Sequence, residues 1–429
     1  MGFRVVDGQI TPQRVTIPQG KRPEHQAVLG KTGSGKSYLL RHFASQDVAS
    51  DGGFVYFDLH GDTTPYLLRL IAREEQRRRR DLSEKLIVIE PADEEFSVGL
   101  NLFERNNGQG SFLQISEFAQ ILRQRWQLES LGARTEELLR NTLLVLSDNN
   151  LTLLELAPLL TDSAFRASCL EKVDNSEIRA YFQSRYDATS EAMQAVYRDP
   201  ILNKVSAFTS NPRFRHMLGQ QRSTFSLPEA IDQGRWVVLN LNKGVLGEQA
   251  LTLGSLFLTK LKNALFARRL RSLFTFYLDE VQNLVSYDSG VDTLLSEARK
   301  FGISIVSANQ FLDQYPPPIR SAILALGSHF FFQLSSIDAH RIALALDGGR
   351  SLTHLLKNLP PRQMIVKSGH YRWQQVRVPD VDNLAVDSSD LYRRCRARWA
   401  RRREDVEQEI QRRHARFARA SNEVLHDWD

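Results

Sequence analysis

The chain has 429 residues and a net charge of +6, and 42% of its residues are hydrophobic and 25% charged, as in a soluble globular protein larger than one ordinary domain. Its two cysteines lie far apart and without metal-like spacing, so neither a disulfide framework nor a zinc site is indicated, and no apolar run approaches the roughly 18 residues that a membrane span needs. The mixed first ten residues do not resemble a signal peptide, so we expect a cytoplasmic protein without a membrane span of its own.

Residues 1–26 carry three prolines, which disfavour long regular elements, so we expect a small β-rich segment there. An apolar run then leads into residues 30–37, which match G-x-x-x-x-G-K-[ST], and an apolar helical run follows. This pattern predicts a phosphate-binding P-loop. The alternative is a glycine-rich turn without a ligand, and the eight matching positions between a strand and a helix argue against it.

The parts of this loop have separate roles. We expect its glycines to adopt positive φ, so that backbone N–H groups converge on phosphate oxygens. Lys36 would place a cation between the outer phosphates, and the Ser37 hydroxyl would ligate Mg²⁺. The predicted nucleotide-binding residues are Gly30, Lys31, Thr32, Gly33, Ser34, Gly35, Lys36 and Ser37.

Strands and helices alternate after the P-loop. Apolar runs predict strands at residues 53–58 and 86–90, with a helix over about 65–72 between them. Strand, helix and strand at this spacing indicate a parallel sheet with crossover helices. We interpret the run from Arg77 to Arg80 as a solvated loop rather than a nucleic-acid site.

The pattern changes between residues 111 and 225, where apolar residues recur at helical spacing and no convincing strand appears. This predicts an inserted all-helical subdomain. Asp162 and Asn211 are expected to be helix caps or turns. The sheet then resumes, with strands predicted at 236–241, 273–280, 303–308 and 330–334, helices at 251–265 and 291–300, and edge strands at 363–367 and 374–378.

Two adjacent acids end the strand at 273–280. In an open α/β sheet, ligands bind at the edge where strands end, and the P-loop opens at that same edge. Asp279 would hold Mg²⁺, and Glu280 would act as the general base that deprotonates an attacking water. Paired acids at a strand end are also common as solvated turn residues, but a P-loop in the same sheet favours catalysis.

Two further residues are candidates for catalysis. Gln310 ends the next strand, where its amide could sense the γ-phosphate or position water, or could merely cap the strand. Arg299 lies on the helix before that strand. It could act as an arginine finger, in cis or in trans, or could complement the dipole at a helix C-terminus.

The basic character of the chain belongs to its C-terminal segment. Residues 391–419 contain eleven arginines and four acidic residues, a local net charge of +7, whereas the rest of the chain carries −1. We expect one helix here, with a sparse apolar line of Trp399, Val406, Ile410 and Phe417. This helix would either bind phosphates, so that removing residues 388–429 flattens the salt dependence of DNA binding, or dock on an acidic neighbouring subunit.

Four motifs together resemble those of the HerA/FtsK superfamily, and most closely the soluble motor domain of type IV secretion coupling proteins (the TraD/TrwB kind) and HerA-like translocases. The motifs lie at residues 28–37, 58–62, 278–283 and 298–310, and the resemblance covers roughly residues 20–380. The resemblance implies a RecA-like P-loop NTPase core, which is a mostly parallel sheet flanked by helices, with an inserted all-helical subdomain. It further implies the type of core in which an additional strand accompanies a catalytic glutamate. It also implies ATP and Mg²⁺ as ligands, and a hexameric ring that pumps DNA.

From these observations we expect a DNA translocase driven by Mg²⁺-dependent ATP hydrolysis, working with conjugation, secretion or defence proteins. The alternatives are an ATPase that powers or assembles a secretion or defence complex without gripping DNA, and a nucleotide-switched scaffold with little turnover, against which Glu280 argues. The predicted organisation is an ATPase core in two parts, 1–110 and 226–386, an all-helical insertion at 111–225 and a basic helix at 387–429.

Overall fold

The computed structural model describes residues 1–104, 111–126, 132–266, 268, 270–284, 291–369, 371–381 and 384–426. The chain divides into two compact units. The sheet unit comprises residues 1–88, 227–244 and 264–398, and the helical unit comprises residues 89–226, 245–263 and 399–429.

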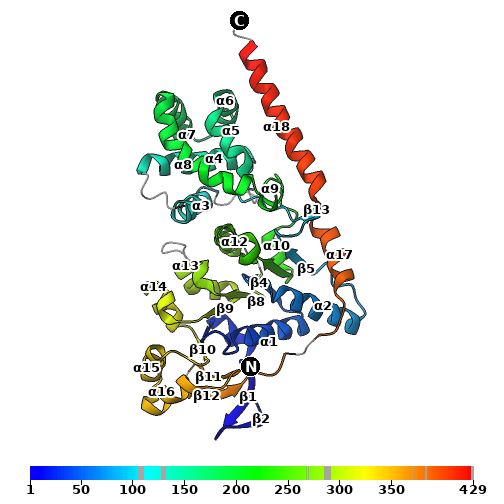
Figure 1. Ribbon diagram of the computed structural model, residues 1–429, viewed down its shortest axis with the longest axis vertical. Coiled ribbons are helices and arrows are strands. Elements are labelled where there is room, and N and C mark those ends of the chain that lie inside the picture. Colours follow the sequence, from blue (N-terminus) through cyan, green and yellow to red (C-terminus); the bar gives the residue numbers. More distant parts are fainter. Residues whose placement is uncertain are drawn as a thin grey trace. The chain divides into compact units, whose positions relative to one another are not determined.

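The sheet unit is built on eleven strands in the order β2-β1-β12-β11-β10-β3-β9-β8-β4-β7-β5 (Figure 1). Neighbours from β10 to β7 run parallel, and β11, β12, β1 and β2 form an antiparallel extension on the side of β10. The strands are β1 (Gly2–Val6), β2 (Gln9–Val15), β3 (Gln26–Leu29), β4 (Gly53–Asp58), β5 (Leu86–Ile89), β7 (Trp236–Asn240), β8 (Phe274–Asp279), β9 (Ile303–Asn309), β10 (Ser328–Phe331), β11 (Gln363–Ser368) and β12 (Gln374–Arg377).

The central strands follow from their sequences. Every residue of β3, β8 and β9 is buried, because helices cover both faces of a parallel sheet and leave no solvent-facing side. The strand β9 lies between β3, which precedes the P-loop, and β8, which ends in the paired acids. This order and the flanking helices confirm the predicted fold class.

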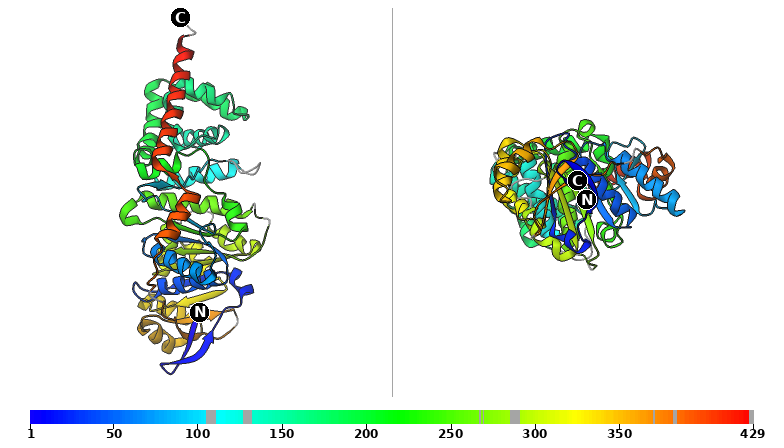
Figure 2. Two further views of the ribbon diagram at one scale, coloured as in Figure 1. Left: turned by 90° about the vertical axis from the view of Figure 1, so that its right-hand side faces the viewer. Right: turned by 90° about the horizontal axis from the view of Figure 1, so that it is seen from below.

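Helices connect the strands of this unit. They are α1 (Lys36–Ala49), α2 (Thr64–Arg78), α10 (Leu227–Asp232), α13 (Val291–Glu297), α14 (Pro317–Leu324), α15 (Ser336–Ala345), α16 (Gly349–Asn358) and α17 (Ser389–Trp399), with a short 3₁₀ turn at Ala298–Phe301. The pair α15 and α16 packs together beside β11, as Figures 1 and 2 show.

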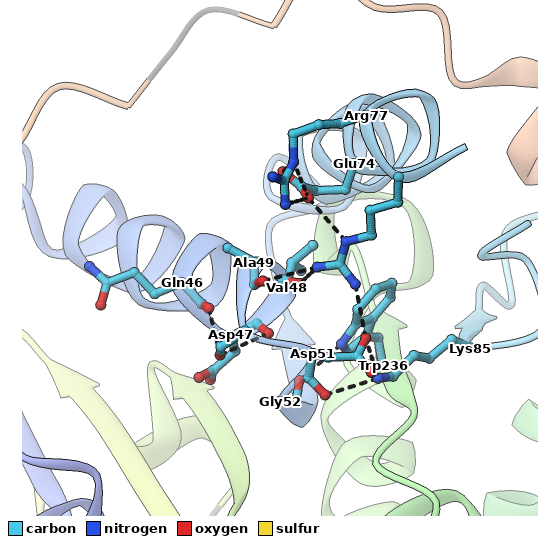
Figure 3. Close-up of polar contacts among 12 residues, drawn as sticks. Gln46, Asp47, Val48, Ala49, Asp51, Gly52, Glu74, Arg77, Lys85 and Trp236 are labelled. Carbon is cyan, nitrogen blue, oxygen red and sulfur yellow. Dashed lines mark hydrogen bonds and ion pairs between the residues drawn. The ribbon is translucent and has the colours of Figure 1, made fainter. Parts of the chain in front are cut away.

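The helix after the P-loop is fixed at its C-terminal end by α2. Arg78 donates to the carbonyl oxygens of Val48 and, at 3.1 Å, Ala49, which have no partner within α1. Glu74 accepts hydrogen bonds from Arg77 (Figure 3) and also from Arg78. The first half of the arginine run is therefore the last turn of a helix with bound side chains, rather than the solvated loop expected.

The helical unit contains the expected helices. Its helices are α3 (Ser111–Arg125), α4 (Ala133–Asp148), α5 (Leu156–Thr161), α6 (Ser163–Leu170), α7 (Ser176–Ala180), a π-helical turn (Tyr181–Tyr186), α8 (Glu191–Thr209), α9 (Pro212–Leu218), α12 (Gln249–Phe266) and α18 (Arg403–His426), with the short α11 (Lys243–Leu246) at the boundary. Asp162 and Asn211 cap α6 and α9 as predicted, since their side chains accept from the N–H groups of Phe165 and Arg213.

The two units do not divide where the sequence pattern placed the boundaries. Residues 89–110 and 245–263 join the helical unit. The reason lies in α12, which the sequence assigned to the core: Lys262 forms an ion pair with Glu117 of α3 at 2.7 Å, and Ser255 accepts a hydrogen bond from Arg125. None of the helices formed by described residues combines the length and apolar character needed to cross a membrane.

The predicted single C-terminal helix is wrong. The segment forms α17, then the two-residue strand β13 (Arg401–Arg402), which pairs antiparallel with β6 (Phe96–Ser97), and then α18. Backbone pairing with another part of the chain outweighs local helix propensity at this point. The break falls where the segment passes from the sheet unit to the helical unit.

Both parts of this segment dock on their own chain. In the sheet unit, Arg394 pairs with Glu75 and Asp81. In the helical unit, α18 packs against α6 and α9 (Figure 1), and Arg413 donates to the fully buried Glu155 at 2.9 Å. Much of the local positive charge is therefore balanced within the molecule.

Candidate nucleotide-binding site

The P-loop joins the end of β3 to the start of α1. Gly33 and Gly35 have φ of 74° and 117°, as expected. Gly30 differs, because close packing rather than positive φ requires glycine there. A Cβ atom on Gly30 would lie 2.5 Å from the Cβ of Phe332 and 2.7 Å from the hydroxyl oxygen of Ser34. The glycines of the motif thus serve two different geometric needs.

Lys36 is buried at the start of α1 and lines the cleft formed by the loop. Its ammonium donates to the carbonyl oxygens of Gly30 at 2.7 Å and Lys31 at 3.1 Å. Burial lowers the pKa of Lys36, and the nearby Asp279 and Glu280 oppose this shift. A phosphate group fits here, because an anion beside the ammonium would offset the cost of burying it.

Asp279 lies at the end of β8, facing the first turn of α1. The Ser37 hydroxyl donates to Oδ2 of Asp279 at 3.5 Å, so the two predicted Mg²⁺ groups meet in the structure. Burial raises the pKa of Asp279 to about 6; Lys36 opposes this shift and Glu280 adds to it. Mg²⁺ favours a hydroxyl and a carboxylate oxygen together with phosphate oxygens and water, so this pair fits the ion.

Glu280 is held in an uncommon backbone conformation, with φ of 53°. Its N–H donates to the carbonyl oxygen of Ala308 in β9 at 2.9 Å. Its carboxylate accepts hydrogen bonds from Gln310 at 3.1 Å and Asn283 at 3.0 Å, and His60 lies 3.4 Å away. Strained backbone retained at a cleft is typical of functional sites, and Glu280 lines the cleft in this strained conformation.

The cleft has a volume of about 420 Å³, within the range of small-molecule sites. Its lining joins the P-loop to residues from four other parts of the sheet unit. The lining residues are Thr32, Gly33, Gly35, Lys36, Ser37, Tyr38, Arg41, His60, Asp62, Asp279, Glu280, Gln310, Pro361 and Arg362. Gln310 therefore lies in the cleft and contacts Glu280 directly.

Arg299 does not share this position. It lies before the first residue of β9, at the sheet edge opposite to the P-loop, and forms a 3.4 Å ion pair with Glu24 just before β3. Arg299 is therefore not among the described residues that line the cleft of its own chain. An arginine finger at this position would have to act on the cleft of a neighbouring subunit.

The loop after β4 supplies residues with weak sequence signals. Both carboxylate oxygens of Asp58 accept hydrogen bonds, from the N–H groups of Gly61, Thr63 and Thr64 and from the Thr64 hydroxyl, at 2.7–3.1 Å. This turn presents His60 to the cleft. Arg41 of α1 fixes the other side of the loop through an ion pair with Asp62 at 2.9 Å.

Tyr38 and Arg362 also line the cleft although no pattern pointed to them. Tyr38 directly follows Ser37 and was part of the apolar helical run. Arg362 is separated from the P-loop by more than 300 positions and reaches it only because β11 pairs with β10, which pairs with β3. No local signal in the sequence could have found it.

The sequence of the chain matches one known family. The model of the family described as the central domain of helicase HerA matches residues 23–261, more than half of the chain. No curated protein matches the sequence.

Several solved structures share the fold. A bacterial conjugative coupling protein, TrwB, has 17% identity and a TM-score of 0.59, over 90% of this chain and 92% of that chain. TrwB with a non-hydrolysable ATP analogue gives 18% identity and a TM-score of 0.62, over 90% and 96%. VirB4 of Thermoanaerobacter pseudethanolicus gives 14% and 0.56, over 89% and 96%.

Proposed function

The chain belongs to the family of the HerA helicase central domain and is a P-loop ATPase, and from this premise we propose that it couples Mg²⁺-dependent ATP hydrolysis to the translocation of DNA. In this proposal it works as a hexameric ring, in conjugative transfer or a related process. The observation that supports the proposal most directly is the joining of a complete P-loop, Asp279, Glu280 and Gln310 in one cleft of a chain that belongs to a helicase family.

The hydrolysis step follows from the positions of these residues. Backbone N–H groups of residues 33–37 and the Lys36 ammonium would bind the phosphates. Ser37 and Asp279 would hold Mg²⁺, which when bound neutralises charge that develops on the phosphate oxygens. Glu280 would accept a proton from the water that attacks the γ-phosphorus, while the bond to the bridging oxygen breaks and ADP leaves with that oxygen.

Gln310 and Asn283 orient the base. Both donate to the Glu280 carboxylate, so they fix the direction in which its free lone pairs point. Gln310 stands at the end of β9, between the P-loop strand and the acidic strand. Gain or loss of the γ-phosphate beside the P-loop strand would therefore change the position of the Glu280 carboxylate through the Gln310 side chain.

DNA as the substrate is supported by membership of a helicase family and by the likeness to a protein described as a conjugative coupling protein. The C-terminal segment remains a candidate DNA-binding element through exposed arginines that form no ion pair with a described carboxylate. Arg412 and Arg416 of α18 are exposed, whereas Arg413 beside them is buried on Glu155. Deleting residues 388–429 would also remove these structural interactions, so point substitutions test DNA binding more cleanly.

The rival function is an ATPase that serves a secretion or defence complex without gripping DNA. The deciding experiment measures the Mg²⁺-ATPase rate of the full chain alone, with single-stranded DNA and with double-stranded DNA, alongside the mass of the oligomer. We expect stimulation by DNA and a hexameric mass with nucleotide. A rate unchanged by either DNA, with a Lys36→Ala variant proving that the rate belongs to this site, would refute translocation and favour the rival.

A second experiment tests whether α18 binds DNA. Replacing Arg412 and Arg416 by glutamine should weaken DNA binding and lower the salt slope by about one for each phosphate that is no longer neutralised. A variant in which Arg350 and Arg372, two exposed arginines of the sheet unit, are both replaced by glutamine removes the same two charges and is the matched control for a reduced positive charge. Equal effects of both variants would show that net charge alone, and not α18, accounts for the binding.

A further inference from the structure

The strand order divides the cleft into two sides. Gln310 follows β9, Asp279 ends β8 and Glu280 follows it, all on one side of β3. Pro361 and Arg362 precede β11 on the other side, and because β11 is antiparallel to β10, its start lies at the same sheet edge as the P-loop. The reacting end of a bound triphosphate belongs beside the acids. The nucleoside must then extend to the opposite side, along Tyr38 and Arg362.

Two planar groups meet on that side. The guanidinium carbon of Arg362 lies 5.2 Å from the centroid of the Tyr38 ring, within the range of a cation–π contact. Asp380 forms an ion pair with Arg362. Tyr38 is 40% exposed and both side chains line the cleft, so a ligand in the cleft can reach them.

The backbone of Arg362 is locked onto the P-loop. It has φ of 65°, a conformation that side chains other than glycine seldom adopt. Its N–H donates to the carbonyl oxygen of Ser34 at 2.8 Å, and its carbonyl oxygen accepts from the N–H of Val378 at 2.9 Å. Its Cα lies 3.0 Å from where a Cβ on Gly35 would be. The structure thus holds a strained residue at a fixed distance from the phosphate-binding amides.

We propose that Tyr38 and Arg362 form the nucleoside subsite of this ATPase, in which the purine base stacks on the tyrosine ring and the guanidinium plane. Aromatic and guanidinium faces attract any base through its π surface, so the subsite distinguishes a nucleotide from a bare triphosphate and discriminates weakly between adenine and guanine. The purely structural alternative is that Arg362 only braces the P-loop, in which case its replacement would weaken the binding of every phosphate ligand.

The test compares three ligands on the full chain with Mg²⁺ and without DNA: ATP, GTP and inorganic tripolyphosphate, by titration calorimetry. Tyr38→Ala and Arg362→Ala should each weaken ATP and GTP binding by about tenfold or more while tripolyphosphate binding stays unchanged. Tyr38→Phe, which keeps the ring, should bind ATP like the wild type. Lys36→Ala should bind none of the three ligands, which verifies that tripolyphosphate occupies the P-loop.

Two results would overturn the subsite. One is an equal decrease of ATP and tripolyphosphate affinity in Arg362→Ala, which would make the residue a brace. The other is wild-type ATP affinity in Tyr38→Ala, which would place the base elsewhere. Because no DNA is present, the proposed translocation and this subsite can fail independently of each other.

Discussion

Asp279 and Asp58 are two buried aspartates at the ends of adjacent parallel strands, and the same substitution should have opposite effects on them. Asp58 satisfies its carboxylate with hydrogen bonds inside its own loop. The Asp279 carboxylate, which we assign to Mg²⁺, accepts a long hydrogen bond from the Ser37 hydroxyl. We therefore expect Asp279→Asn to stabilise the ligand-free fold and Asp58→Asn to destabilise it.

The magnitude follows from the pKa of Asp279. Burial raises it from the usual 3.8 to about 6, so the folded protein binds the proton more tightly than the unfolded chain. This difference between the folded and unfolded pKa of Asp279 corresponds to about 3 kcal/mol in the free energy of unfolding. That contribution is fully present below the unfolded pKa and is lost as the pH rises through the folded pKa of about 6. Asparagine is neutral at every pH. Its advantage should therefore reach up to about 3 kcal/mol at pH 7.5 and fall by about 1.4 kcal/mol at pH 5.

Thermal unfolding of the full chain in EDTA, without nucleotide, measures this difference. At about 2–4 °C per kcal/mol for a domain of this size, Asp279→Asn should raise the midpoint of the sheet unit by up to about 6–12 °C at pH 7.5, and by about half as much at pH 5. Asp58→Asn should lower it at both pH values, since an amide N–H₂ cannot accept the bonds that a carboxylate oxygen does. A lower midpoint for Asp279→Asn at pH 7.5, or a gain independent of pH, would refute the reasoning.

Three further outcomes are expected from the same structure. Glu280→Gln should bind ATP with near wild-type affinity and hydrolyse it at least about a hundredfold more slowly, because the geometry survives and the base does not; a wild-type rate would show that another group takes the proton. Mixing Arg299→Ala with Lys36→Ala subunits should restore part of the ATPase rate, because one type of interface keeps both residues; no recovery under conditions where the subunits exchange would exclude a role in trans. Arg413→Met should destabilise the helical unit by up to about 3–5 kcal/mol in thermal unfolding, because it removes the guanidinium from the buried Glu155 carboxylate and leaves only Thr152 and His414 beside it; restoring the midpoint with Glu155→Gln in the same chain would verify that cause, and an unchanged midpoint for the single variant would show that the pair is not buried in solution.

The local part of this site was determined by the sequence alone. The P-loop needs its glycines, lysine and serine at adjacent positions, so its pattern survives in the linear chain and identified the ligand class. Asp279 and Glu280 were equally readable, because a fully apolar strand must end at the sheet edge where its polar residues become accessible. The alternation of strands and helices indicated the parallel sheet for the same reason, since burial on both faces leaves a continuous apolar run.

The tertiary structure decided everything that depends on residues far apart in the chain. It placed Arg362 against Gly35 through two strand pairings, joined Gln310 after β9 to Glu280 after the neighbouring β8, and placed Arg299 at the far edge of the sheet. It also broke the C-terminal helix at β13, where backbone hydrogen bonds to β6 outweigh helix propensity, and buried Arg413 on Glu155. Propensity and spacing describe neighbours within a few residues, whereas these interactions arise only once the sheet order has brought distant segments together.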